Sequence, residues 1–140
     1  MTLREFKILL LSQTPGRTVT PDETMLINSI QTAVLQVAHD TVPLRLFRRD
    51  RPAEVLRRVS DEGYIRYPRR VIMDGDDVDL DEILMDAAAY YTNSIIEQQK
   101  KGTHLNAYEK IIQRNNERLI ETHLEVCASD GGDYGSRPFV

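Results

Sequence analysis

Apolar residues recur at helical spacing in four stretches of this 140-residue chain, and each stretch follows a residue that can cap a helix. In the first stretch, Thr2 and Glu5 form a capping-box pattern, in which a hydroxyl and a carboxylate three residues apart satisfy free N–H groups at a helix start. Apolar residues then follow every three or four positions as far as Ser12, and Pro15-Gly16 favours a turn. The pattern predicts a first helix over about residues 2–12.

The second stretch has the same signature with one more signal. Thr20 and Glu23 form another capping-box pattern, and Pro21 occupies the first helical position, where its missing N–H is harmless. An apolar stripe continues to Ala38, and Pro43 disfavours helical geometry in the residue before it. We therefore expect a second helix over about 21–40.

The last two stretches predict a pair of long helices. Asp79 and Glu82 resemble a capping box at the start of a helix over about 80–100, and Gly102 is typical of a helix end. Thr103 can then cap a fourth helix, and a connection this short places the two helices antiparallel. The apolar stripe of the fourth helix consists of Leu105, Tyr108, Ile111, Ile112, Leu119 and Leu124. Asn115 also falls on this stripe, where it is either partly exposed or fixes the register between packed helices.

The middle of the chain has no helical periodicity. Leu44–Phe47 is compatible with a short strand, and Ala53–Val59 with one or two helical turns. Tyr64–Tyr67 and Val71–Met73 are rich in β-forming residues, but Pro68 between them favours an edge strand or an irregular extended segment. These two runs are expected to pair with each other as a small hairpin or with another subunit.

Together the patterns predict a mostly α protein: a helical bundle with a long antiparallel helical hairpin, a small β or extended element in the middle and an extended C-terminal arm. We expect one helical domain over residues 1–127, with an irregular Arg-rich insertion at about 43–73. The arm, residues 128–140, is rich in Gly, Asp and Ser and ends in an aromatic tip. Such a composition does not form a core by itself, so we expect a partner to hold it.

Composition narrows the class of protein. The hydrophobic fraction is 41% and Trp is absent, so the core must be aliphatic with some Tyr. No apolar run approaches the roughly 20 residues that span a bilayer, and no membrane partner is expected. The single cysteine, Cys127, excludes an internal disulfide framework and fits a reducing compartment.

The charges are distributed unevenly along the chain. Residues 45–70 contain nine arginines and four acids, a net charge of +5, whereas residues 71–99 contain eight acids and neither Lys nor Arg. The arginine-rich segment is either a solvated face with local ion pairs or a surface that meets the acidic segment of another copy. Nucleic-acid binding is a weaker explanation because the net charge of the chain is −4.

Catalytic and metal-binding patterns are missing. The acidic run Asp74–Glu82 does not match a calcium loop, because Gly and Glu are absent from the positions that require them. His39, His104 and His123 lack the spacing of metal ligands, and no nucleophile motif or phosphate-binding loop is present. We therefore expect a protein that is not an enzyme and that carries no cofactor and no metal.

The residues most suited to a subunit or partner interface are the arginines and tyrosines of the middle segment, two acids of the acidic run and three residues of the arm. Arg and Tyr are enriched at protein interfaces, although they also stack on nucleic-acid bases. Within the arm, Phe139 is the expected anchor. The candidate interface residues are Arg45, Arg48, Arg49, Tyr64, Arg66, Tyr67, Arg69, Arg70, Asp76, Asp77, Tyr134, Arg137 and Phe139.

Three segments also carry a likeness to a known family: YIRYPRRV at 64–71, the acidic run Asp74–Asp81 leading into Leu80–Ile96, and Asn106–Ile112 in the last predicted helix. In this order of elements the chain resembles the head-to-tail adaptor proteins of tailed bacteriophages, also called connector or neck proteins. The likeness covers about residues 20–125 as a pattern of elements, without a catalytic motif.

The resemblance implies a structural virion protein located in the neck between capsid and tail and made in the host cytoplasm. It implies a homo-oligomeric ring, usually a dodecamer, that docks beneath the portal protein, joins a tail or stopper protein and lets DNA pass through its lumen. It further implies that the C-terminal arm reaches into the portal. Two alternatives remain: a small helical nucleic-acid-associated or regulatory binding protein that uses the Arg/Tyr segment, and a small hydrolase or nuclease that uses the Asp74–Glu82 carboxylates with a divalent metal.

Overall fold

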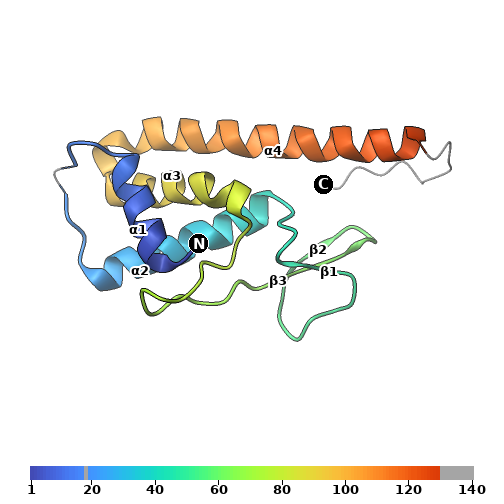
Figure 1. The fold of residues 1–140 in the computed structure, drawn as a ribbon, viewed down its shortest axis with the longest axis horizontal. Helices are drawn as coiled ribbons and strands as arrows, with labels where there is room; N and C mark the ends of the chain where they lie inside the picture. Colours follow the sequence, from blue (N-terminus) through green and yellow to red (C-terminus); the bar gives the residue numbers. More distant parts are fainter. Residues whose placement is uncertain (18, 130–140) are drawn as a thin grey trace.

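The chain folds into a mostly α structure, as its pattern predicts, with a small sheet in the middle (Figure 1). The computed structural model describes the backbone of residues 1–17 and 19–129, and the side chains as far as residue 117. In chain order the elements are α1 (Leu3–Ser12), α2 (Glu23–Asp40), β1 (Phe47–Arg48), β2 (Val55–Val59), β3 (Gly63–Arg66), the 3-10 turn η1 (Glu82–Leu84), α3 (Met85–Ile96), a second 3-10 turn η2 (Gln98–Lys100) and α4 (Lys101–Ser129).

The first helix start is confirmed and the second is shifted. The Thr2 hydroxyl accepts a hydrogen bond from the Glu5 N–H, and the Glu5 carboxylate accepts one from the Thr2 N–H, which completes the expected capping box. In α2 the cap is Asp22 rather than Thr20, because the Asp22 carboxylate accepts from the Met25 N–H at 2.7 Å. The helix therefore begins two residues later than predicted.

Helix α3 lies at the centre of the bundle and packs against α1, α2 and α4. Three consecutive alanines, Ala87–Ala89, are fully buried, and their small side chains let the neighbouring helices come close on several sides. Phe6, Ile30 and Val37 fill the core from α1 and α2. The core is mainly aliphatic and also includes the aromatic side chains of Phe6 and Tyr108.

Helix α4 is tied to the bundle by polar contacts with the end of α2. The Tyr108 hydroxyl donates to the Asp40 carboxylate at 2.6 Å, and the Asn116 amide donates to the Asp40 carbonyl at 3.3 Å. The residue that bonds across the packed helices is thus Asn116, whereas Asn115 is half-buried beside it. Burial and the hydrogen bond to Asp40 raise the pKa of Tyr108 far above its ordinary value.

Helix α4 is also much longer than its neighbour. At 1.5 Å per residue its 29 residues extend about 44 Å, against about 18 Å for the 12 residues of α3. Figure 1 shows the C-terminal half of α4, in orange to red, running beyond the other helices. Leu119 and Leu124, expected on the apolar stripe, lie in this half, outside the described side chains.

The predicted boundaries of the last two helices are wrong. Helix α3 begins at Met85 instead of about 80, because the carboxylates of Asp79 and Asp81 bind groups elsewhere in the chain rather than capping a helix. It ends at Ile96, and the turn η2 follows. Gly102 and Thr103, expected to separate two helices, both lie inside the first turn of α4.

The sheet consists of three antiparallel strands in the order β1-β3-β2. The helical turns expected at Ala53–Val59 are wrong, since Val55–Val59 is strand β2. The hairpin expected between Tyr64–Tyr67 and Val71–Met73 is also wrong, because β3 pairs with the strands that precede it and residues 71–73 lie outside the sheet. Strand periodicity is hidden in VLRRV, where apolar and basic residues do not alternate.

One close contact holds two strands of the sheet together, and hydrogen bonds from β2 attach the sheet to the helices. At Gly63 any side chain would collide with the neighbouring strand, because an added Cβ would lie 2.4 Å from the Arg48 carbonyl oxygen. From β2, the Arg57 guanidinium donates to the carbonyl oxygens of Ala38, at 3.2 Å, and of Thr41. These carbonyls lie at the C-terminal end of α2, where a positive charge is favourable. The sheet is therefore attached to one end of the helical bundle.

Candidate interface and buried charge clusters

Asp79, a residue of the acidic run, is the centre of a buried charge cluster. Its carboxylate is only 4% exposed and receives two hydrogen bonds from the Arg66 guanidinium, at 2.6 and 3.0 Å. The Arg45 Nε donates to it at 3.0 Å and the Arg69 backbone N–H at 2.8 Å. Burial alone would raise the pKa of Asp79, but the hydrogen bonds from Arg66 and the Arg69 N–H outweigh it, so this pKa lies below its ordinary value.

The Asp79 cluster shows that two of the candidate interface arginines form ion pairs within their own chain. Arg45 and Arg66 were candidates for contacts with another chain, but the structure pairs both with Asp79 of their own chain. The Arg66 side chain is largely buried by this pairing, whereas Arg45 keeps an exposed surface. Local ion pairing thus accounts for these two arginines.

The other candidate arginines are exposed. Arg48, Arg49, Arg69 and Arg70 all lie at the surface. Arg48 donates to the backbone carbonyls of Arg45 and Phe47, which holds its guanidinium beside β1. These guanidinium groups form no ion pair with a buried acid in the described part of the chain, so they remain accessible to a partner.

The two candidate tyrosines take different positions. Tyr64 is half-buried on the central strand β3 and pairs with Arg48 on β1 and Arg58 on β2. Tyr67 is exposed, and with Arg70 it lines a hollow of about 490 Å³ between α2 and the segments that flank β2 and β3. Glu54 lines the same hollow.

Three carboxylates of the acidic run, those of Asp76, Asp79 and Asp81, accept hydrogen bonds from backbone N–H groups of their own chain. Asp76 accepts from the N–H groups of Ile72, at 2.8 Å, and Met73, at 2.9 Å, and these bonds hold its pKa below the ordinary value. Asp81 accepts from the N–H groups of Leu44 and Arg45. Asp76 is therefore occupied in a turn, whereas Asp77 is exposed.

The first part of the acidic run, residues 74–77, lies against α1. The backbone N–H groups of Leu3 and Arg4 donate to the carbonyls of Asp76 and Asp74, and the Lys7 ammonium lies 2.8 Å from the Asp74 carboxylate. In Figure 1 this turn and α1 lie toward one end of the bundle, and the sheet with its exposed arginines lies toward the other. The turn at Asp74–Asp77 thus lies apart from the sheet, whereas Asp79 and Asp81 of the same run bind the arginine-rich segment directly.

A second buried charge cluster lies at the joint between α3 and α4, and sequence reasoning missed it. Arg17 donates to the Asn93 side chain, and its Nε lies 3.9 Å from the Glu97 carboxylate. His104 lies 3.3 Å from the same carboxylate, and all of these side chains are buried. The Arg17 Nε is buried without a hydrogen-bond partner among the described residues. Arg17 follows a Pro-Gly turn far from Glu97 in sequence, so no local pattern indicates the contact.

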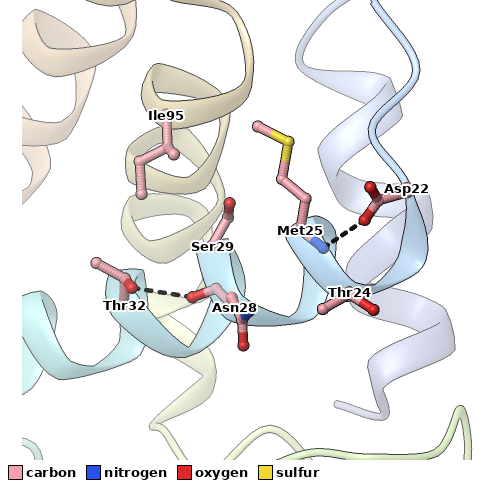
Figure 2. A pocket seen from close by; sticks show the side chains of 7 residues that line it. All are labelled: Asp22, Thr24, Met25, Asn28, Ser29, Thr32 and Ile95. Atoms are coloured by element: carbon pink, nitrogen blue, oxygen red, sulfur yellow. Dashed lines mark hydrogen bonds between the residues drawn. The ribbon is translucent and has the colours of Figure 1, made fainter.

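A hollow of about 530 Å³ lies between α2 and the end of α3 (Figure 2). Figure 2 shows Met25 and Ile95 reaching into it from the two helices, with Asn28, Ser29 and Thr32 along its floor. The Asp22 carboxylate caps the Met25 N–H, and the Thr32 hydroxyl donates to the Asn28 carbonyl at 2.9 Å. These polar groups serve the helix itself, and the arrangement does not assemble a nucleophile with a base.

Two further findings concern metal binding and membrane-spanning helices. Among the described side chains, those of residues 1–17 and 19–117, no group of three or more His, Cys, Asp or Glu is placed to hold a metal ion. Over the described backbone, residues 1–17 and 19–129, each helix is too short or too polar to cross a membrane. Tyr134, Arg137 and Phe139 lie outside the described residues.

Comparison with known proteins adds no assignment: no protein-family model, no curated protein and no solved structure matches this chain.

Proposed function

We propose that this chain is the subunit of a homo-oligomeric ring that acts as a head-to-tail adaptor in a virion neck. The observation that carries the proposal is that exposed side chains of opposite charge lie apart on the surface. Arg48 and Arg49 are exposed at the sheet, and Asp77 is exposed beside α1. Opposite charges at opposite ends attract when copies follow one another head to tail, whereas like ends repel.

Head-to-tail contact is the geometry from which rings are built. A heterologous interface joins two different faces of the same chain, and it closes into a ring when the rotation between copies divides a full turn. An isologous dimer would instead place the arginine-bearing ends together, which their repulsion opposes. The charge separation therefore supports a ring over a two-fold dimer.

The position of the ring in a neck rests on the resemblance to phage adaptors. In this proposal α3 and the long α4 form the antiparallel hairpin of the subunit, and copies assemble as a dodecamer beneath the portal protein. A tail or stopper protein binds the opposite side, and DNA passes through the lumen without sequence-specific contacts. The arm over 128–140, with Tyr134, Arg137 and Phe139, docks on a neighbouring chain. The protein performs no catalysis in this role.

The experiment is a measurement of particle mass and shape. Native mass spectrometry and negative-stain electron microscopy of the purified chain, alone and with a portal protein, should show closed rings of uniform copy number. Raising the salt concentration should weaken their assembly, because exposed charges are screened. A monodisperse monomer that ignores the portal protein would contradict the proposal.

The exposed arginines and Tyr67 also favour a second candidate, a nucleic-acid-associated binding protein. Guanidinium groups bind phosphates, and an exposed aromatic ring can stack on a base. This candidate predicts DNA binding whose affinity falls steeply as salt rises, with a slope set by the number of phosphates contacted. Binding measured by fluorescence anisotropy at several salt concentrations separates it from the ring subunit, which needs no such affinity.

A further inference from the structure

The hollow of about 490 Å³ beside Tyr67, which we call the Tyr67 hollow, holds two opposite charges that are not paired with each other. Glu54 and Arg70 both line it, and both are exposed. The ion pairs among the described residues involve other acids and other basic groups, including Arg66 with Asp79 and Arg58 with Asp61. A carboxylate and a guanidinium are therefore both available to whatever enters the Tyr67 hollow.

Helix α2 supplies one wall of the Tyr67 hollow. Asn28, Gln31, Thr32 and Leu35 all line it, and their spacing of three and four residues places them on one face of the helix. The side-chain amides of Asn28 and Gln31 have no hydrogen-bond partner among the described residues, whereas the Thr32 hydroxyl donates to the Asn28 carbonyl. A side-chain amide can both donate and accept, so this wall can bond the peptide groups of an extended chain.

The segments beside the sheet supply the other wall. The Tyr67 N–H donates to the Glu54 carbonyl at 3.4 Å, which joins the residue after β3 to the residue before β2. The Tyr67 side chain is exposed, and Pro68 lies next to it in the lining. With Leu35 across the hollow, these side chains add apolar surface to the amides and the charges. This combination suits an extended peptide that carries both charges and an aromatic side chain.

The arm of this chain has matching chemistry. Residues 130–140 lie outside the described backbone, and their sequence contains two aspartates, one arginine and two aromatic residues. Asp133 and Arg137 can pair with charges of either sign, and Tyr134 and Phe139 can pack on a ring. The three glycines of the same segment add no side chains that would screen its peptide groups.

The position of α4 indicates that the arm meets a neighbouring copy. Helix α4 continues about 18 Å past Glu117 to its end at Ser129, at 1.5 Å for each of the 12 residues. Figure 1 shows this half of α4 running beyond the other helices, so the arm begins outside the bundle of its own chain. At least 11 residues follow Ser129, and they can extend up to about 36 Å. A segment of this length can reach a copy that lies beside the first one in a ring.

We propose that residues 130–140 of one copy lie in the Tyr67 hollow of the next copy. Arg137 pairs there with Glu54, the aspartates of the arm pair with Arg70, and an aromatic ring packs on Tyr67. Exposed ion pairs are weak, so a single arm binds weakly and the repetition of the contact around the ring makes it stable. The inference rests on the ring function and specifies where the arm of the subunit binds.

A cross-link in the full-length chain tests the contact. In a Cys127→Ser background, Thr32→Cys marks the Tyr67 hollow and Ser136→Cys marks the arm. Glu62→Cys with Ser136→Cys is the matched control, because Glu62 is exposed on the turn between β2 and β3, outside the lining. Under mild oxidation the Thr32 variant should give at least about tenfold more disulfide than the control, because docking raises the effective concentration of the two thiols.

Non-reducing electrophoresis shows which chains are joined. The product of the Thr32 variant should be a ladder of linked chains, since each arm binds the next copy. Equal yields in the variant and the control, or a product that stays within one chain, would overturn the inference. Rings of the wild-type chain in native mass spectrometry would leave the ring function in place after such a result, whereas a wild-type monomer would contradict the ring function itself.

A charge exchange gives a second measurement on the same cross-link. Glu54→Arg and Arg137→Glu should each lower the yield by about threefold, as expected for the loss of an exposed ion pair, and the two together should restore it. Glu62→Arg makes the same change outside the hollow and should leave the yield unchanged. Losses that add in the double variant would show that these two residues do not meet. A single-stranded DNA oligonucleotide that abolishes the cross-link would assign the hollow to nucleic acid and overturn the inference.

Discussion

The described part of the chain contains two buried charge clusters, and they differ in how completely their polar groups are satisfied by hydrogen bonds. Around Asp79, one carboxylate receives hydrogen bonds from two guanidinium groups and a backbone N–H. Around Glu97, a carboxylate lies beside Arg17 and His104, but the Arg17 Nε is buried without a hydrogen-bond partner among the described residues. Both clusters join segments that are far apart in sequence.

The difference shows what each cluster can contribute to stability. A buried charge lowers stability unless its hydrogen bonds are nearly complete, because it has lost its contact with water. Asp79 meets that condition, so it can hold the sheet against the acidic run. The Glu97 cluster meets it only in part, and its net contribution must be smaller.

The largest predicted effect is the loss of the Asp79 carboxylate. Asp79→Ala leaves Arg45 and Arg66 facing each other without the anion between them, and it should lower the free energy of unfolding by about 3–5 kcal/mol. Urea denaturation monitored by circular dichroism measures the change. Asp77→Asn, at an exposed neighbour, should stay within about 0.5 kcal/mol of the wild type. Equal losses of stability for Asp79→Ala and Asp77→Asn would contradict the stabilising role of the Asp79 cluster.

A smaller effect is expected at Arg17. Arg17→Met removes a guanidinium whose bonds are incomplete, so the free energy of unfolding should fall by about 1–3 kcal/mol. Adding Glu97→Gln should partly restore it, because the buried carboxylate that Arg17 accompanied is then neutral. A double-mutant cycle measures this coupling. Additive losses would show that Arg17 and Glu97 do not act together.

The low pKa of Asp79 also predicts that the stability of the fold depends on pH. Since the pKa of Asp79 is lower in the folded chain than its ordinary value of 3.8, its contribution is present above about pH 4 and is lost as the pH falls through the folded pKa. Stability should therefore decline on acidification in this range, and Asp79→Asn should decline less. Unfolding midpoints measured between about pH 2.5 and about pH 6 test this, and parallel curves for the two chains would contradict it.

The smallest effect is expected within the Asp79 cluster itself. Arg45 is partly exposed, whereas Arg66 is largely buried and bonds Asp79 with two nitrogens. Arg45→Met should lower the free energy of unfolding by less than about 1 kcal/mol, as is typical of exposed ion pairs. Arg66→Met should cost more, and the reverse order in a thermal melt would contradict the assigned roles.

Local signals in the sequence predicted the parts of the fold that local interactions determine. The capping box at Thr2 and Glu5 placed the start of α1 correctly, and apolar periodicity found α2. The start of α3 was misplaced because Asp79 and Asp81 bind groups from other parts of the chain, which no local pattern reveals. Strand β2 was missed for a similar reason, since Arg57 extends to the end of α2 and breaks the expected alternation.

The sequence predicted which residue types form the candidate interface, but it did not predict which of those residues are exposed. The sequence indicated an arginine-rich and an acidic segment, and the structure separates the exposed Arg48 and Arg49 from Arg66, which is paired internally. That distinction depends on which arginines reach Asp79, a property of the folded chain. The exposed Ile8 on α1 gave no signal either, because exposure of an apolar helical residue is decided by tertiary packing.

The most direct test of the account is a charge reversal read by particle mass. Arg48→Glu with Arg49→Glu should reduce assembly, and Asp77→Lys should do so as well, because each change sets like charges against each other between copies. A chain that carries all three substitutions should assemble again, because the new positive charge at position 77 of one copy then faces the new negative charges at positions 48 and 49 of the next copy. Multi-angle light scattering at low salt should report recovery toward the wild-type mass. A triple variant that stays as dissociated as its parents, or parents that assemble normally, would contradict the claim that the two ends of this chain bind each other.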